Sequence, residues 1–67
     1  MEENVQAAMN ALTYALRYSR HGKEIAYIDV TEDEKRAVIH FENKHQTVNI
    51  EGDSALAAII DICKALL

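Results

Sequence analysis

The last fourteen residues, 54–67, constrain the fold most, because they carry only two charges, Asp61 and Lys64. In a helix with about 100° per residue, these two side chains share one narrow sector. Apolar side chains occupy nearly all the rest of the helix surface: Leu56, Ile59, Ile60, Ile62, Cys63, Leu66 and Leu67. A helix that is apolar almost all round has to be buried almost all round. A chain of 67 residues offers little cover, so we expect a second chain to supply it.

The small size of the chain points the same way. A domain of this length buries only about 60% of its unfolded surface, and small folds usually add disulfides, a metal or a partner chain. Cys63 is the only cysteine, so no internal disulfide can form, and a lone cysteine in an apolar run is typical of a reducing compartment. We therefore predict a single domain over residues 1–67 that forms a homo-oligomer, with a dimer favoured.

The charge of the chain disfavours two classes of partner. The formal net charge is −4, which opposes non-specific binding to nucleic acid and to anionic membranes. The first residues are acidic, where a signal peptide would be basic, and the longest apolar run, 55–60, is too short to span a bilayer. We expect a cytoplasmic protein that does not bind a membrane.

The chain begins with a predicted helix over residues 4–21, with Asn4 as its N-cap and Gly22 just after its end. One apolar stripe suits packing on a sheet: Val5, Met9, Leu12 and Leu16. A second stripe lies roughly opposite: Ala7, Ala11, Tyr14 and Tyr18. The polar face contains Gln6, Asn10, Thr13, Arg17 and Arg20. One sheet cannot cover both stripes, so we interpret the second as a contact surface.

Alternating patterns predict strands over residues 23–31, 36–42 and 45–50, followed by a helix over 54–67 that Asp53 or Ser54 caps. Short turns between strands favour an antiparallel meander. The predicted core face contains Ala26, Ile28, Val30, Ala37, Ile39, Phe41, Val48 and Ile50. The open face contains Ile25, Tyr27, Asp29, Val38, His40, Glu42, Thr47 and Asn49. The fold class is α+β, a two-layer α-β-β-β-α domain with both helices on one sheet face.

This element order resembles that of the double-stranded-RNA-binding domain over nearly the whole chain. That family binds RNA through a lysine cluster at the start of its last helix, and through a Gly-Pro and a His in its first hairpin loop. The corresponding places here are residues 52–56, which contain no basic side chain, and the acidic turn 32–35. The resemblance implies the fold and a dimerisation role, which degenerate members of the family serve. The residues themselves disfavour RNA binding.

No residue pattern predicts catalysis. His40 and His45 lie on neighbouring strands near Glu42, and we favour a solvated sheet face there over a weak metal or proton site. Cys63 has apolar neighbours, which make a thiol inert. The chain has no glycine-rich phosphate loop and no G-x-S-x-G motif. We predict no catalytic residue, no metal site, no cofactor and no enzymatic activity.

One basic cluster combines cations with tyrosines near the end of the first helix: Tyr14, Arg17, Tyr18, Arg20, His21 and Lys23. The simpler interpretation is that these cations complement the helix dipole and are solvated. The alternative is an anion site, in which arginines hold phosphate and a tyrosine stacks on a base. The second interpretation predicts a nucleotide-like ligand.

The function that we expect is that of a small, acidic, non-enzymatic interaction or regulatory protein. It would act as a homo-oligomer on a macromolecular partner, as phage-encoded inhibitors of host systems do, with its acidic surface against a basic groove. The predicted oligomer interface comprises Ala7, Ala11, Leu56, Ile59, Ile60, Cys63 and Leu67. The first alternative is a binder of an anionic small molecule through the basic cluster. The second is a degenerate nucleic-acid-binding fold.

Overall fold

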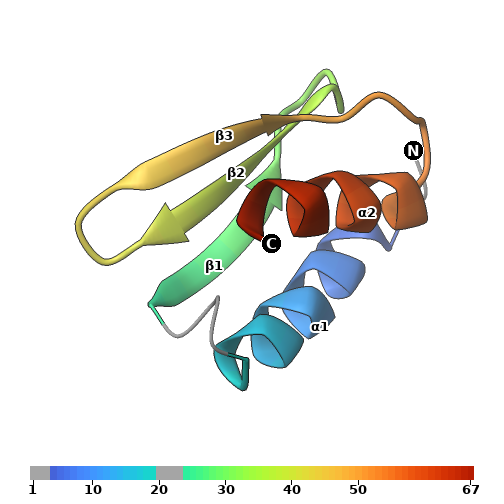
Figure 1. Ribbon diagram of the computed structural model, residues 1–67. Coiled ribbons are helices and arrows are strands. Elements are labelled where there is room, and N and C mark those ends of the chain that lie inside the picture. Colours follow the sequence, from blue (N-terminus) through green and yellow to red (C-terminus); the bar gives the residue numbers. More distant parts are fainter. Residues whose placement is uncertain (1–3, 20–23) are drawn as a thin grey trace.

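The computed structural model describes residues 4–19 and 24–67, and it contains the five predicted elements in the predicted order. The elements are α1 (Val5–Arg17), β1 (Ile25–Val30), β2 (Arg36–Phe41), β3 (His45–Asn49) and α2 (Ala55–Leu66). The strands form one antiparallel sheet in the order β1-β2-β3. Both helices lie on the same side of the sheet (Figure 1), with α1 packed on β1 and α2 on β3. The predicted α+β class is confirmed.

The core lies between the sheet and the two helices. It comprises Met9, Leu12, Leu16, Ile25, Ile28, Ala37, Ile39, Val48, Ile50, Ala58 and Ile62. Val30 and Phe41 are half-buried and pack against this cluster. The alternation in β2 and β3 therefore correctly predicts which side chains point inward, because adjacent residues of a strand point to opposite faces.

The inward face of β1 differs from the prediction. Ile25 pairs with Phe41 and Tyr27 pairs with His40, so a bulge at Ala26 leaves that residue without a partner of its own. A bulge adds one residue to a strand and reverses the alternation beyond it. Ile25, predicted on the open face, is consequently only 2% exposed, and Ala26, predicted in the core, is exposed.

The start and end of α1 also depart from the sequence pattern. Asn4 occupies the N-cap position, but its side chain makes no capping hydrogen bond. The helix ends at Arg17, and the amide and hydroxyl of Ser19 both donate to the carbonyl oxygen of Leu16, at 2.9 and 2.6 Å. The predicted helix therefore extends too far, since Tyr18 and Ser19 already lie beyond its end, and residues 20 and 21 lie outside the described residues. Gly22 lies outside the described residues.

Thr13 is buried, although the sequence pattern places it on the polar face of α1. Its Oγ1 donates a hydrogen bond to the carbonyl oxygen of Met9 at 2.9 Å. That bond satisfies the hydroxyl within its own helix, so burial leaves no unpaired polar group. The rest of the side chain can then pack as a small apolar group.

The cap of α2 agrees with one of the two predicted residues. Ser54 Oγ accepts a hydrogen bond from the backbone N–H of Ala57 at 3.1 Å. This bond satisfies one of the amides that a helix start leaves unpaired. Ser54, and not Asp53, is therefore the N-cap.

Candidate functional site

The outer face of α2 carries large apolar side chains that the protein's own chain leaves uncovered. Leu56, Ile60 and Leu67 are 66%, 46% and 73% exposed, and we call these three residues the α2 stripe. They recur at i, i+4 and i+11, which places them on one side of the helix. The opposite side is buried in the core through Ala58 and Ile62. The helix is thus apolar on both sides, and only one of these sides is covered.

Two other residues of the predicted interface border this stripe. Ile59 and Cys63 are half-buried and pack against the core. They form the margin between the buried side of α2 and its stripe. Several exposed apolar side chains on one side of a helix mark an interaction site more often than an isolated exposed leucine does.

The second stripe of α1 is also uncovered. Ala7 and Ala11 are exposed, and Tyr14 and Tyr18 are 63% and 91% exposed. The two helices contact each other within the same layer (Figure 1). The helical side of the protein therefore presents small and aromatic side chains on α1 together with larger aliphatic side chains on α2.

Arg17, one of the residues of the predicted anion site, binds the backbone of β1. Its Nε donates to the carbonyl oxygen of Ile25 at 2.9 Å, and its Nη2 donates to that of Ala26 at 2.6 Å. The guanidinium carbon lies 5.8 Å from the centre of the Tyr14 ring. These bonds hold α1 against β1, a positional role that the sequence pattern does not predict. The available signal is the spacing of Gln6 and Arg17, which are eleven residues apart and therefore lie on one face.

The other residues of the predicted anion site are only partly brought together. Tyr14 and Arg17 line a hollow of about 240 Å³ beside Tyr27. Tyr18 is not among the lining residues of this hollow. Arg20, His21 and Lys23 lie outside the described residues. Binding of an anionic ligand here stays a prediction.

The open face of the sheet carries a cluster around His40. The imidazole stacks on the Tyr27 ring with a centroid distance of 4.1 Å and an angle of 13° between the planes. His40 Nε2 lies 3.4 Å from Asp29 Oδ2, and the centroid of the His45 ring lies 6.3 Å from that of His40. The predicted proximity of the two histidines is confirmed. In the part of the chain that the structure describes, no group of three His, Cys, Asp or Glu side chains has the geometry of a metal site.

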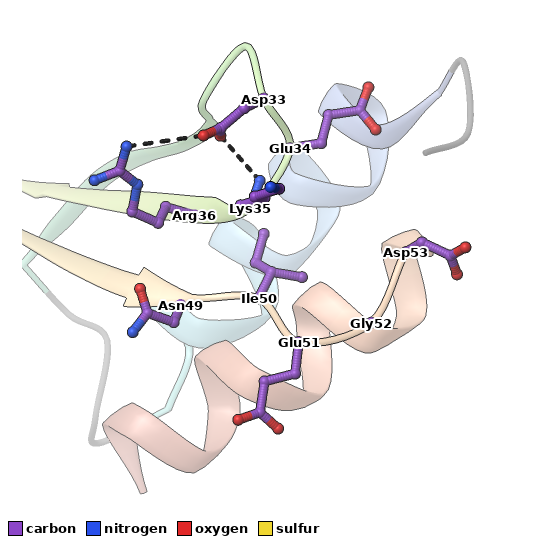
Figure 2. Close-up of a pocket in the computed structure, with 9 residues that line it drawn as sticks. All are labelled: Asp33, Glu34, Lys35, Arg36, Asn49, Ile50, Glu51, Gly52 and Asp53. Carbon is purple, nitrogen blue, oxygen red and sulfur yellow. Dashed lines mark hydrogen bonds and ion pairs between the residues drawn. The ribbon is translucent and has the colours of Figure 1, made fainter.

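A hollow of about 820 Å³ lies at one end of the sheet, between residues 33–36 and 49–53. In Figure 2, the carboxylates of Glu34, Glu51 and Asp53 point outward and do not converge on one point. The hydroxyl of Thr31 and the amide of Lys35 donate to the Asp33 carboxylate and lower its pKa, with a further contribution from Arg36. The bonds of Asp33 order the turn, and the surface here is acidic without a shaped ligand site.

The comparisons with known proteins add no functional information. No family model, no curated protein and no solved structure matches this chain. Within residues 4–19 and 24–67, no helix is long and apolar enough to cross a membrane. Proposals about function therefore depend on the geometry of the chain itself.

Proposed function

We propose that the protein is a non-enzymatic interaction module that works as a homo-oligomer, with the α2 stripe at the contact between copies. The observation that carries this proposal is the exposure of Leu56, Ile60 and Leu67 on one side of a helix whose other side is fully buried. Full burial of an exposed side chain of this size contributes roughly 1.5–3 kcal/mol, and these three side chains are still 46–73% exposed. Their burial between two copies therefore favours association.

A second copy fits the stripe for a geometric reason. If the two-fold axis is perpendicular to α2, the two copies of the helix lie antiparallel, and Leu56 of one copy then approaches Leu67 of the other. Ile60 lies between these two positions along the helix, near the axis. Asp61 points away from the stripe, since its Oδ2 accepts a hydrogen bond from the backbone N–H of Glu51 at 3.0 Å. A contact through the stripe thus brings no acidic groups together.

The size of the interface adds one requirement. A stable interface buries about 800 Å² of each partner, and the whole chain exposes 4642 Å². Such an interface therefore covers about a sixth of the surface, more than three side chains provide. The margin formed by Ile59 and Cys63 adds area, and a further surface of the protein has to take part.

The wider role that we propose is regulatory. The assembled protein engages another macromolecule in the cytoplasm, as an inhibitor does, and performs no reaction itself. This part of the proposal is supported by the acidic character of the chain, which favours a basic partner surface. It does not use the α2 stripe, which the second copy covers.

The test is the mass in solution, measured by light scattering after gel filtration over a dilution series. The wild type is expected to be a dimer or larger, and Leu56→Asp or Ile60→Asp is expected to yield a monomer, because each places a charge in a desolvated contact. Ala65→Asp is the matched control, since Ala65 is exposed on α2 outside the stripe. Wild-type mass in both stripe variants would contradict the proposal.

A further inference from the structure

The two outer strands of the sheet differ in how their free edges are covered. On β1, side chains of α1 bind the outward carbonyl groups: Gln6 donates to Ile28 at 3.0 Å, and Arg17 donates to Ile25 and Ala26. Along the outer side of β3, by contrast, no group from residues 4–19 or 24–67 makes a hydrogen bond. An uncovered edge strand is a template on which another strand can pair.

The hydrogen bonds between β2 and β3 identify the backbone groups that point outward. Phe41 donates its N–H to the carbonyl oxygen of Lys44 at 2.8 Å, and Ile50 donates to that of Lys35 at 2.7 Å. In an antiparallel ladder, every second residue bonds to the same neighbouring strand. In the register observed, Gln46 and Val48 therefore bond to β2. The amide and carbonyl groups left for the outer side belong to His45, Thr47 and Asn49.

The sequence of β3 is suited to pairing with itself. The strand is His-Gln-Thr-Val-Asn, without a Lys, Asp, Glu or Pro, which are the residues that usually block an edge. A two-fold axis at Thr47 places this residue opposite its own copy and His45 opposite Asn49. These are the residues whose backbone groups point outward, so each strand donates three hydrogen bonds and accepts three. A threonine pair is favourable across strands, and no like charges meet.

We infer that β3 pairs antiparallel with β3 of a second copy, centred on Thr47, so that the two sheets form one continuous six-stranded sheet. This inference rests on the proposed function, because it takes the second copy as the partner. The β3 edge supplies the additional surface that the α2 stripe alone does not provide. The β3 edge contributes backbone hydrogen bonds and the stripe contributes apolar area.

The position of α2 makes the two contacts compatible. Figure 1 shows α2 on the β3 side of the helical layer and α1 on the β1 side, in agreement with the packing of each helix. When β3 pairs with its copy, the two α2 helices are consequently the neighbours on either side of the two-fold axis. The α2 stripes then lie on one side of a shared sheet, and α1 stays remote from the axis.

A proline at residue 47 tests the pairing. Thr47→Pro removes an outward N–H and leaves the ladder to β2 intact, and edge strands tolerate proline with this orientation. The dissociation constant of the dimer is expected to rise at least tenfold, with the circular dichroism of the fold retained. Thr47→Val is the matched control, because it keeps the N–H and the strand preference, and it is expected to leave the mass unchanged. A folded Thr47→Pro protein with the dissociation constant of the wild type would overturn the inference.

A cross-linking experiment keeps the inference falsifiable if the proline variant fails to fold. In a Cys63→Ala background, Thr47→Cys places two thiols at a directly opposed pair, where the Cα atoms are about 5.5 Å apart, within disulfide range. His45→Cys is the control, because the two copies of residue 45 are then four positions out of register, about 13 Å apart. Oxidation is expected to cross-link the Thr47→Cys protein rapidly and not the His45→Cys protein. Equal rates, or no cross-link in the Thr47→Cys protein, would overturn the register.

The experiments separate the failure of this inference from that of the proposed function. If Ile60→Asp dissociates the dimer while Thr47→Pro and the cross-link show no effect, the α2 contact stands and the β3 pairing is overturned. If the wild type is monomeric at all concentrations, both proposals are overturned. Loss of the dimer in both folded variants, with the cross-link at residue 47, supports both.

Discussion

The two helices lie in one layer and have similar lengths, 13 residues in α1 and 12 in α2, but they treat the neighbouring strands differently. α1 extends Gln6 and Arg17 over the free edge of β1 and binds three of its carbonyl groups. α2 has no side chain over the edge of β3 among the described contacts. Its Asp61 binds the amide of Glu51, which follows the strand.

The two halves of the molecule therefore differ in how far they cover their own surface groups. The α1–β1 half satisfies outward carbonyl groups with its own side chains. The α2–β3 half leaves an apolar stripe and a row of backbone groups exposed on neighbouring elements. Apolar area and unpaired backbone groups are the two features that association uses. Their combination in one half of the molecule supports a partner on that side.

The largest change in the free energy of unfolding is expected for a substitution on the buried side of α2, and a much smaller change for one on its exposed side. Ile62→Ala opens a cavity in the core and is expected to lower the free energy of unfolding by about 2–5 kcal/mol. Leu56→Ala, on the stripe, is expected to change the same quantity in the dilute monomer by about 0.5 kcal/mol or less. Urea titrations at low protein concentration measure both. A large loss for Leu56→Ala in the monomer would show that the stripe stabilises its own chain.

A smaller effect is expected from opening the edge of β1. Arg17→Ala removes both hydrogen bonds to that strand and is expected to lower the free energy of unfolding by about 1–3 kcal/mol. It also exposes a second free edge, so light scattering should detect species larger than those of the wild type. Arg17→Lys keeps the charge but not the planar guanidinium, and its free energy of unfolding should lie between those of the wild type and Arg17→Ala. Unchanged stability and mass for Arg17→Ala would show that β1 needs no cover.

The smallest effect is expected on the stability of the fold at low pH. The pKa of Asp33 is lowered in the folded protein, first by its hydrogen bond from Thr31 and then by that from the amide of Lys35. The ionised form therefore stabilises the fold above a pH of about 4, the usual value for an unfolded aspartate. This contribution is lost as the pH falls through the lowered value. Asp33→Asn should flatten the acid limb of a stability curve, and an unchanged limb would contradict this assignment.

Much of the fold can be predicted from the sequence because its signals are local. Alternation identifies Ala37, Ile39 and Val48 as inward side chains, and Ser54 is one of two predicted caps. The bulge at Ala26 cannot be predicted, since it depends on how β1 pairs with β2. The pattern assigns Thr13 to the polar face because its bond to Met9 forms only in the folded helix.

The candidate site can be predicted only in part. The apolar surplus of α2 is visible in the sequence, which predicts Leu56, Ile59, Ile60, Cys63 and Leu67 as interface residues. Only the packing distinguishes the exposed members of this set from Ile59 and Cys63, which lie against the core. The role of Arg17 and the free edge of β3 depend on sheet order and on which helix covers which strand. Those are tertiary properties. The spacing of Gln6 and Arg17 places both on one face of α1, but it does not identify the strand that this face covers.

Amide hydrogen exchange at β3 shows whether the α2–β3 half binds a second copy. At a concentration where light scattering shows a dimer, we expect the Thr47 amide to be protected, and we expect it to exchange rapidly after dilution to the monomer. The amides of Gln46 and Val48, which bond to β2, should be protected at both concentrations. Fast exchange of the Thr47 amide in the dimer would contradict pairing of β3 with a second copy, because its N–H would then have no partner strand.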